Sequence, residues 1–284
     1  MQPLFKLFLK KLLRTFGIKT NSETRMALSD EERREIVARM DAGDFDFSAD
    51  LIIKMKHDWH IDPACVPYPT VLVQAMERGD TDAQNHPDMM EICYRLPYSF
   101  AYEDSQADKY RELIDVVIQK GWAMDGRVVA DIGCGFGGLL EQVHRGHRPA
   151  ELIGVEVAHS PINWMRNNRP HIKGCVASLD MPSGAWQSSC NFHADVVFCT
   201  EVLEHLLRPE SALANLMALR KKNGVLVLSV PNGRADTAAQ HINFWSPESW
   251  QRFLETTAAG SHIETFLLNN PHAPGGSDII ALIS

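Results

Sequence analysis

The sequence predicts an α/β fold: a doubly wound, seven-stranded, mostly parallel sheet with an antiparallel edge strand, preceded by an N-terminal helical cap. Three observations predict it. From residue 104 onward, short apolar runs alternate with amphipathic helical stretches, which is the pattern of βα units. A glycine-rich turn follows the first of these runs. The last two runs follow each other without an intervening helical stretch, so they predict a closing hairpin.

Composition and charge place the chain among globular proteins. Of its 284 residues, 45% are hydrophobic and 23% charged, and no apolar run approaches the ~20 residues of a membrane-spanning helix. The net charge of −8 disfavours broad binding to a phosphate backbone, so nucleic acid is not an expected partner. The cysteines form no C-x-x-C pair, which indicates reduced thiols in a cytoplasmic protein rather than a disulfide framework or a zinc site: Cys65, Cys93, Cys134, Cys175, Cys190 and Cys199.

Residues 1–103 predict a helical cap, and residues 104–284 predict the larger domain. Residues 1–19 mix lysine and arginine with leucine and phenylalanine at helical spacing, which is typical of a basic amphipathic helix and unlike a secretory signal. Such a helix packs on its own domain, or it lies on an anionic membrane surface or a partner protein. Residues 29–40 predict a second helix, and prolines interrupt residues 48–103.

The elements of the larger domain follow in a regular order. The first helix is expected at 105–120. The predicted strands are apolar runs bounded by glycine, proline or polar residues, at 128–132, 152–157, 174–177, 195–199, 224–230, 262–268 and 278–283. Helices are expected from 138, from the end of the second strand to 164, at 209–220 and at 247–254. A turn between the last two strands is marked by Pro271, Pro274, Gly275 and Gly276.

The glycine-rich turn is the main functional signal. Gly133, Gly135 and Gly138 satisfy G-x-G-x-x-G between a strand and a helix, where a backbone can approach a ligand closely. Glu156 follows Gly135 by 21 residues, at the position of a ribose-binding acid. Both a dinucleotide and S-adenosylmethionine fit these features. Asp131, an acid just before the turn, disfavours a pyrophosphate and suits a ligand that carries an amine and a sulfonium.

The segment D-I-G-C-G-F-G-G at 131–138 resembles motif I of class I S-adenosylmethionine-dependent methyltransferases. Later landmarks of that family follow in order: G-V-E at 154–156, D-V-V-F-C-T-E-V-L-E-H at 195–205, V-P-N-G at 230–233 and H-I-N-F-W-S-P-E-S-W-Q-R-F-L at 241–254. The motifs are specific as a set, and they extend over about two-thirds of the chain. The resemblance implies S-adenosylmethionine as the cofactor and the fold expected above.

The resemblance also implies which residues bind the cofactor. Motif I would border the methionine part, Glu156 would hold both ribose hydroxyls, and Val157 would lie against adenine. The family often carries an acid after the third strand that binds the adenine amine; here Ser178 and Asp180 are alternatives for that role. The full predicted set is Asp131, Gly133, Cys134, Gly135, Gly137, Glu156, Val157, Ser178, Leu179 and Thr200.

Four polar residues are candidates for the chemistry: Glu201, Glu204 and His205 follow the fourth predicted strand, and His241 follows the fifth. Ligand sites of such folds open at these carboxyl ends. In one interpretation, His205 or His241 is a general base. In another, all four bind a divalent cation such as Mg²⁺, Mn²⁺ or Zn²⁺. In a third, Glu204 and His205 cap the next helix. We take His205, His241 and Glu201 as the catalytic candidates and assign no metal, although the four residues are candidate ligands.

The E-x-L-E-H sequence at 201–205 resembles a group that includes ubiquinone-biosynthesis O-methyltransferases, and it resembles metal-dependent small-RNA 2′-O-methyltransferases. The sequence therefore predicts O-methylation of a small molecule or a sugar (glycan), with residues 1–103 forming the acceptor side. The alternatives are a metal-dependent RNA 2′-O-methyltransferase, an NAD-dependent oxidoreductase and a non-catalytic binding module. We expect a cytoplasmic protein, with peripheral membrane or partner contact through residues 1–19 as an alternative to packing of that helix on its own domain.

Overall fold

The computed structural model describes residues 90, 94, 103, 105–179, 190–236, 241–270 and 276–284. The predicted helical cap and its amphipathic first helix lie outside these residues, apart from Met90, Tyr94 and Glu103. Asp180, one alternative for the adenine amine, also lies outside them. The boundary between residues 103 and 104 therefore stays a prediction.

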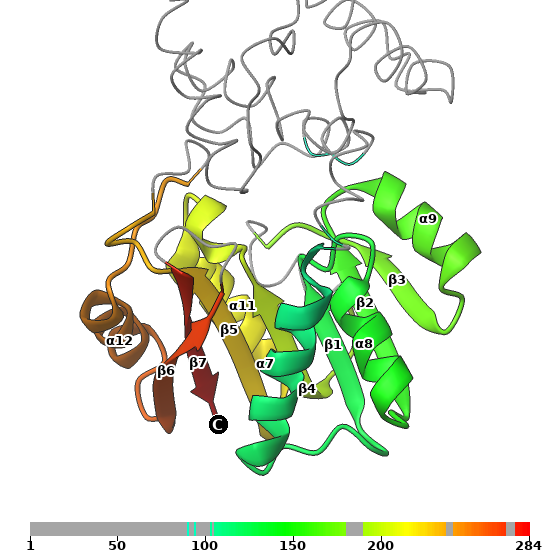
Figure 1. The fold of residues 1–284 in the computed structure, drawn as a ribbon, viewed down its shortest axis with the longest axis horizontal. Helices are drawn as coiled ribbons and strands as arrows, with labels where there is room; N and C mark the ends of the chain where they lie inside the picture. The colour runs from blue at the N-terminus through cyan, green and yellow to red at the C-terminus, as the bar shows by residue number, and fades with distance from the viewer. Residues whose placement is uncertain are drawn as a thin grey trace, which may run out of the picture.

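A seven-stranded sheet forms the centre of the described part of the chain (Figure 1), in the order β3-β2-β1-β4-β5-β7-β6. The first five strands are parallel, and β7 is antiparallel to both of its neighbours. The strands are β1 (Val128–Ile132), β2 (Glu151–Glu156), β3 (Ile172–Val176), β4 (Ala194–Thr200), β5 (Arg220–Pro231), β6 (Ile263–Asn269) and β7 (Ser277–Ile283). The predicted fold class is confirmed, and the structure adds that the antiparallel strand β7 lies between β5 and β6.

Burial explains the order of the last two strands. In β7, every residue after Ser277 is buried, whereas in β6 Leu268 is the buried position. A continuous apolar strand needs neighbours on both sides and cover on both faces, while a half-exposed strand suits the edge of a sheet. The apolar run of β7 therefore takes the inner position.

Helices cover both faces of the sheet (Figure 1). Their bounds are α7 (Ala107–Gln119), α8 (Gly138–Gly146), α9 (His159–Asn168), the short 3₁₀ helix η3 (Leu203–His205), α11 (Pro209–Leu219) and α12 (Pro247–Thr257). The first three share one apolar core, and the last two share the other. Alternate residues of β5 enter the two cores: Val225 and Val227 join the first, Leu226 and Leu228 the second. This three-layer arrangement is a doubly wound fold.

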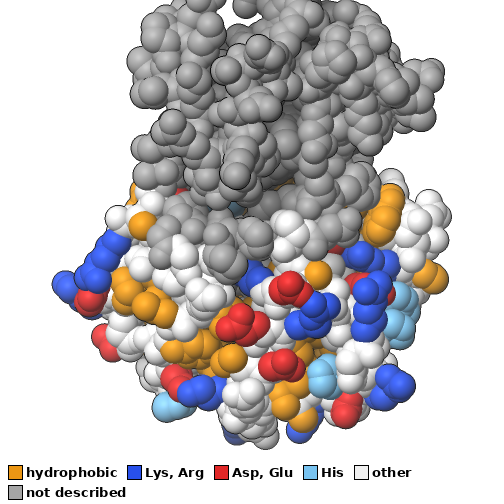
Figure 2. All heavy atoms as spheres, viewed as in Figure 1, with side chains coloured by type: hydrophobic (Ala, Val, Ile, Leu, Met, Phe, Trp, Pro, Cys, Tyr) orange, Lys and Arg blue, Asp and Glu red, His pale blue; other side chains and the backbone are white. Residues whose placement is uncertain are grey.

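The visible surface of the described part carries intermixed acidic and basic side chains (Figure 2). This face of the described part therefore presents no single-sign field of the kind that draws a protein to a phosphate backbone. Among the described residues, no helix has the length and apolarity needed to cross a membrane.

Candidate active site

The glycine turn lies where the strand order reverses, between the carboxyl end of β1 and the start of α8. Gly133, Gly135 and Gly137 all have positive φ, at 78°, 53° and 82°. Side chains also have no room at two of these positions, because a Cβ at Gly133 would collide with Val202, and one at Gly137 would lie 2.6 Å from the sulfur of Met165. The sequence therefore uses glycine here both for backbone conformation and for space. Open α/β sheets bind ligands at this switch point.

Glu156 ends β2 and faces the turn. Its Oε2 accepts hydrogen bonds from the Tyr94 hydroxyl at 2.8 Å and from the backbone N–H of Gly135 at 3.1 Å. Its Oε1 accepts from the N–H of Val157 at 2.7 Å. Burial raises the pKa of this carboxyl, while the hydrogen bonds oppose the shift. Glu156 is therefore a buried acceptor that already holds a hydroxyl group.

Asp131 lies at the other side of the turn and is only 3% exposed. Its Oδ1 has no hydrogen-bond partner within the described ranges. Burial raises the pKa of Asp131 well above its usual value, and the carboxylates of Glu103 and Glu156 raise it further. An unsatisfied buried acceptor beside two other acids favours a cationic partner.

Glu103 belongs to the same acidic group and was not predicted. Its Oε2 accepts from the backbone N–H of Phe136 at 2.8 Å, and its Oε1 lies 2.9 Å from Nη1 of Arg169. Arg169 also donates to the carbonyl of Phe136 at 2.5 Å. Burial raises the pKa of Glu103 to about 7, against the lowering effect of Arg169. Glu103 and Arg169 thus hold the turn at the start of α8.

The other predicted cofactor residues lie around the same strand ends. Cys134 and Leu179 are buried in the two cores, and the carbonyl of Leu179 accepts from the side chain of Asn215 at 3.0 Å. Ser178 follows β3 by two residues and is half-buried. Thr200 ends β4 and pairs with Ser229 of β5. Their contacts with a cofactor stay predictions.

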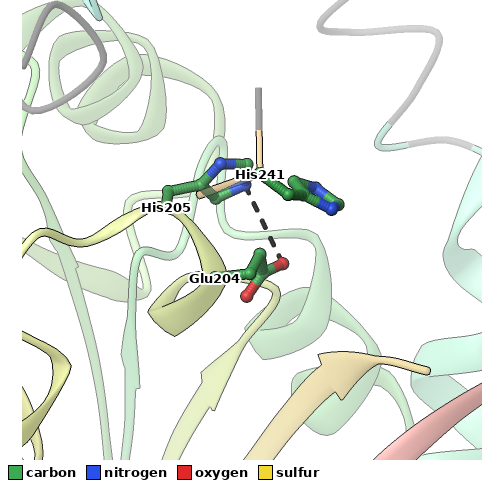
Figure 3. Close-up of side chains that lie close together, drawn as sticks. All are labelled: Glu204, His205 and His241. Atoms are coloured by element: carbon green, nitrogen blue, oxygen red, sulfur yellow. Dashed lines mark ion pairs between the residues drawn. The ribbon is translucent and has the colours of Figure 1, made fainter. Parts of the chain in front are cut away.

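Glu204, His205 and His241 come together above the end of β4. One ligand atom from each lies within 4.8 Å of the others, and Figure 3 shows the three side chains converging. The Nε2 of His205 lies 3.8 Å from Oε1 of Glu204, and the two imidazole centroids are 4.8 Å apart. The Nδ1 of His241 contacts Oδ2 of Asp236. Asp236 therefore orients the His241 ring, a role that sequence spacing did not reveal.

Asn243 explains how distant segments meet at this cluster. Its side-chain amide donates to the carbonyls of Leu203 at 3.1 Å and Leu206 at 2.7 Å. The backbone N–H groups of Ile242 and Asn243 both donate to the carbonyl of Glu204, at 2.9 and 3.0 Å. These bonds fix the residues after His241 against η3, so His241 is held beside His205.

Glu204 is the most unusual group of the cluster. It is 1% exposed, and neither of its carboxylate oxygens has a hydrogen-bond partner among the residues that the structure describes. Burial raises the pKa of Glu204 well above its usual value, and the nearby Glu201 carboxylate raises it further. A buried carboxyl of this kind must take up a proton or face a cation.

Glu201 does not join the three-residue cluster, although it was predicted with it. Its backbone has a positive φ of 56°, and its Oε1 accepts from the Ser229 hydroxyl at 2.7 Å. Lys109 lies 3.4 Å from Oε1 of Glu201 and 2.7 Å from Oδ2 of Asp278. Glu201 thus belongs to a network of buried charges that Lys109 neutralises in part. Lys109 and Asp278 carried no motif that sequence reasoning could use.

Residues 104–259 match the model of a family described as methyltransferase domain, which is more than half of the chain, and the chain belongs to that family. Its membership sets aside the NAD-dependent oxidoreductase. The fold and the glycine turn are those of the class I, S-adenosylmethionine-dependent group.

Curated relatives include two ubiquinone biosynthesis O-methyltransferases. The Alkalilimnicola ehrlichii protein is 30% identical over 150 residues, which are 50% of this chain and 60% of that protein. The mitochondrial protein of Schizosaccharomyces pombe is 37% identical over 112 residues, which are 37% of this chain and 38% of that protein. The chain thus spans only part of the length of these relatives, 60% of the first and 38% of the second.

Solved structures share the fold at low identity. The plantazolicin methyltransferase BpumL in complex with SAH has a TM-score of 0.52 and 11% identity, over 75% of this chain and 99% of that one. A chain from the complex of the Haloferax volcanii Trm112 methyltransferase activator with a methyltransferase has a TM-score of 0.52 and 12% identity, over 64% and 92%. These likenesses show the fold alone.

Proposed function

We propose that the chain transfers a methyl group from S-adenosylmethionine to a hydroxyl oxygen of a small-molecule acceptor. The observation that carries this proposal is the pair of buried acids, Asp131 and Glu156, at neighbouring strand ends around the glycine turn. The ubiquinone biosynthesis O-methyltransferases among the relatives support oxygen as the acceptor atom.

Each acid suits one part of S-adenosylmethionine. Glu156 accepts from the hydroxyl of Tyr94, so its carboxylate is placed to accept from ribose hydroxyls. Asp131 has a buried oxygen with no partner in the described ranges, which suits an ammonium or sulfonium charge. The turn at 133–137 gives the ligand access to backbone at positions where side chains would collide. The residues present therefore fit this ligand.

When bound, S-adenosylmethionine supplies an electrophilic methyl group on a positively charged sulfur. Asp131 would hold that charge, and Glu156 would fix the nucleoside through its ribose hydroxyls. A positively charged ligand also lowers the pKa of the Asp131 carboxyl, since an opposite charge favours the ionised form. Placement of the methyl group close to the acceptor oxygen supplies much of the rate enhancement.

His241 is the residue that we propose as the general base. Its Nδ1 contacts the Asp236 carboxylate, which leaves Nε2 to take a proton from an acceptor hydroxyl. His205 lies against His241 with ring centroids 4.8 Å apart and is more exposed, so it contributes to the wall of the acceptor site.

A divalent cation is a second role for the same cluster, favoured by Glu204. Its two buried oxygens have no hydrogen-bond partner among the described residues, and two imidazoles lie beside it. One carboxylate with two imidazoles is a ligand set for Zn²⁺, Mn²⁺ or Fe²⁺. A cation held there would polarise an acceptor oxygen and lower the pKa of its hydroxyl.

Chelation separates these two roles. The wild-type chain and Glu204→Gln would be assayed after treatment with EDTA and again after addition of Mg²⁺, Mn²⁺, Zn²⁺ or Fe²⁺. A metal role predicts loss of wild-type activity and its recovery with one ion, without recovery in Glu204→Gln. Full activity in EDTA contradicts the metal role and leaves His241 as the base.

The test of the function itself is turnover. The purified chain would be given S-adenosylmethionine with a panel of phenols and sugars, each beside its amine analogue, and S-adenosylhomocysteine would be measured. We expect release with hydroxyl acceptors and little with the amines. Release with the amines alone would contradict O-methylation, and binding without any turnover would favour a non-catalytic module.

Three finer predictions are proposals. One is a glycan as the acceptor. The other two concern the N-terminal part of the chain: an acceptor side formed by residues 1–103, and a membrane or partner contact through residues 1–19. The start of the family match at residue 104 supports a boundary there. Deletion of residues 1–19 should leave S-adenosylhomocysteine affinity intact; loss of binding would place that helix in the core instead.

A further inference from the structure

Two cysteine side chains meet at the β3 side of the sheet. Cys175 lies in β3, and Cys190 lies shortly before β4 begins at Ala194. Their sulfur atoms are 2.8 Å apart, and neither is in a disulfide. This separation is shorter than the roughly 3.5–4.0 Å at which non-bonded heavy atoms pack. The two sulfurs are therefore in direct contact across 14 intervening residues.

The two thiols differ in environment. Cys175 is half-buried, so a small oxidant can reach it, whereas Cys190 is 3% exposed. A hydrogen bond from the Cys190 thiol lowers the pKa of Cys175 to about 7, although burial opposes this shift. The same contact and burial raise the pKa of Cys190. At neutral pH the reactive thiolate is thus on Cys175, with Cys190 beside it as a second thiol.

We propose that Cys175 and Cys190 form a dithiol that hydrogen peroxide oxidises to a disulfide. The Cys175 thiolate attacks one peroxide oxygen, the O–O bond breaks, and, with uptake of a proton, water leaves and Cys175 becomes a sulfenic acid. The Cys190 sulfur then attacks the Cys175 sulfur, the S–O bond breaks, and a second water carries away the Cys190 proton. Two thiols and one peroxide thus give one disulfide and two waters.

The geometry needs little change for this bond. A disulfide joins sulfurs at about 2.05 Å, so the pair must approach by less than about 1 Å. The bond would tie β3 to the residues that lead into β4. In β3, Val176 pairs with Glu156, and the N–H of Ala177 donates to the Glu156 carbonyl at 3.0 Å. The modification would therefore lie next to the strand end that carries the proposed ribose ligand, although it does not depend on that role.

Cys134 and Cys199 provide matched controls. Both are buried, and burial raises the pKa of each thiol well above its usual value. Buried thiols of this kind react slowly with peroxide. Cys65 and Cys93 lie outside the described residues, so peptide mapping must distinguish them from the proposed pair.

The experiment is peroxide treatment of the full folded chain, followed by alkylation and peptide mass spectrometry. We expect a linked peptide containing Cys175 and Cys190, with a mass lower by two hydrogens, that dithiothreitol reverses. The linked peptide should persist in Cys199→Ser and disappear in Cys175→Ser.

The variant Cys190→Ser tests whether Cys190 is the thiol that reacts with the oxidised Cys175. In Cys190→Ser, the sulfenic acid at Cys175 has lost its neighbouring thiol, so dimedone should label Cys175 several-fold more than in the wild-type chain. Labelling confined to Cys65, Cys93 or the buried controls would overturn the proposal. Wild-type chain that stays folded and yields no Cys175–Cys190 peptide would also overturn it.

Discussion

Two buried glutamates show how the two halves of the site differ: Glu156 is the last residue of β2, and Glu204 lies in η3, shortly after β4. Glu156 is 4% exposed and its carboxylate accepts from three donors, while Glu204 is 1% exposed and its carboxylate has no hydrogen-bond partner among the described residues. Burial raises the pKa of both. The first environment is built for neutral hydroxyl and N–H donors, and the second for a proton or a cation. This contrast supports our proposal of two parts of the site: a holding half around Glu156 that binds the cofactor, and a reacting half around Glu204, His205 and His241.

The largest expected effect is on the reacting half. His241→Ala should lower kcat by roughly 10²–10⁴-fold, because it removes the proposed base. Its affinity for S-adenosylhomocysteine should stay within about threefold of wild type, since Glu156 is untouched. Steady-state release assays and calorimetry measure the two quantities. His262→Ala, an exposed histidine before β6, is the matched control. If His241→Ala lost affinity for S-adenosylhomocysteine without a fall in kcat, the proposed division into a holding half and a reacting half would be contradicted.

The next effect is on the holding half. Glu156→Gln should weaken S-adenosylmethionine binding by roughly 5- to 150-fold, the equivalent of about 1–3 kcal/mol for a lost charged hydrogen bond. Tyr94→Phe removes the hydroxyl that occupies Glu156 but keeps the carboxylate, so its affinity should equal or exceed that of wild type. Calorimetry compares the three chains. Weaker binding by Tyr94→Phe would mean that the Tyr94 hydroxyl helps to bind the ligand and does not merely occupy the position of a ribose hydroxyl on Glu156.

The smallest of these effects concerns Glu103 and pH. Burial raises the pKa of Glu103 from its usual value of 4.5 to about 7 in the folded chain. The stabilising contribution of its protonated form is therefore complete below about pH 4.5 and is lost as pH rises through about 7. Relative to Glu103→Gln, the wild-type chain should lose about 2 kcal/mol of unfolding free energy between pH 5 and 7.5. Urea titrations of both chains measure this difference.

A constant difference between Glu103→Gln and wild type across that range would contradict the raised pKa. The variant Arg169→Gln tests the part of this pKa shift that depends on the Arg169 guanidinium. Without the guanidinium, which lowers the pKa of Glu103, this pKa should rise further, so the loss of stability should continue to higher pH than in the wild-type chain. We therefore expect Arg169→Gln to be less stable than wild type at pH 7.5, with the two chains converging at pH 5.

Local patterns made the holding half predictable. The glycine turn, Asp131 and Glu156 lie in strand-turn units whose spacing follows from the fold, so their proximity could be expected from the sequence. Glu103 and Tyr94 reach the same turn from positions 33 and 62 residues away from their partners. No periodicity or motif encodes such contacts, because they depend on how separate segments pack.

The reacting half was predictable only in part. The sequence placed Glu201 with Glu204, His205 and His241, whereas the structure brings only the last three together. The positive φ of Glu201 and the buried charge of Lys109 direct its side chain elsewhere. The structure thus keeps Glu204, His205 and His241 together, held by Asn243.

The most direct test of the division is a crystal structure of the chain with S-adenosylhomocysteine. The account predicts both ribose hydroxyls within about 2.5–3.0 Å of the Glu156 carboxylate, with the Tyr94 hydroxyl displaced, and the sulfur between Asp131 and the Glu204–His241 cluster. A nucleoside bound elsewhere, with the Tyr94 hydroxyl still on Glu156, would contradict it.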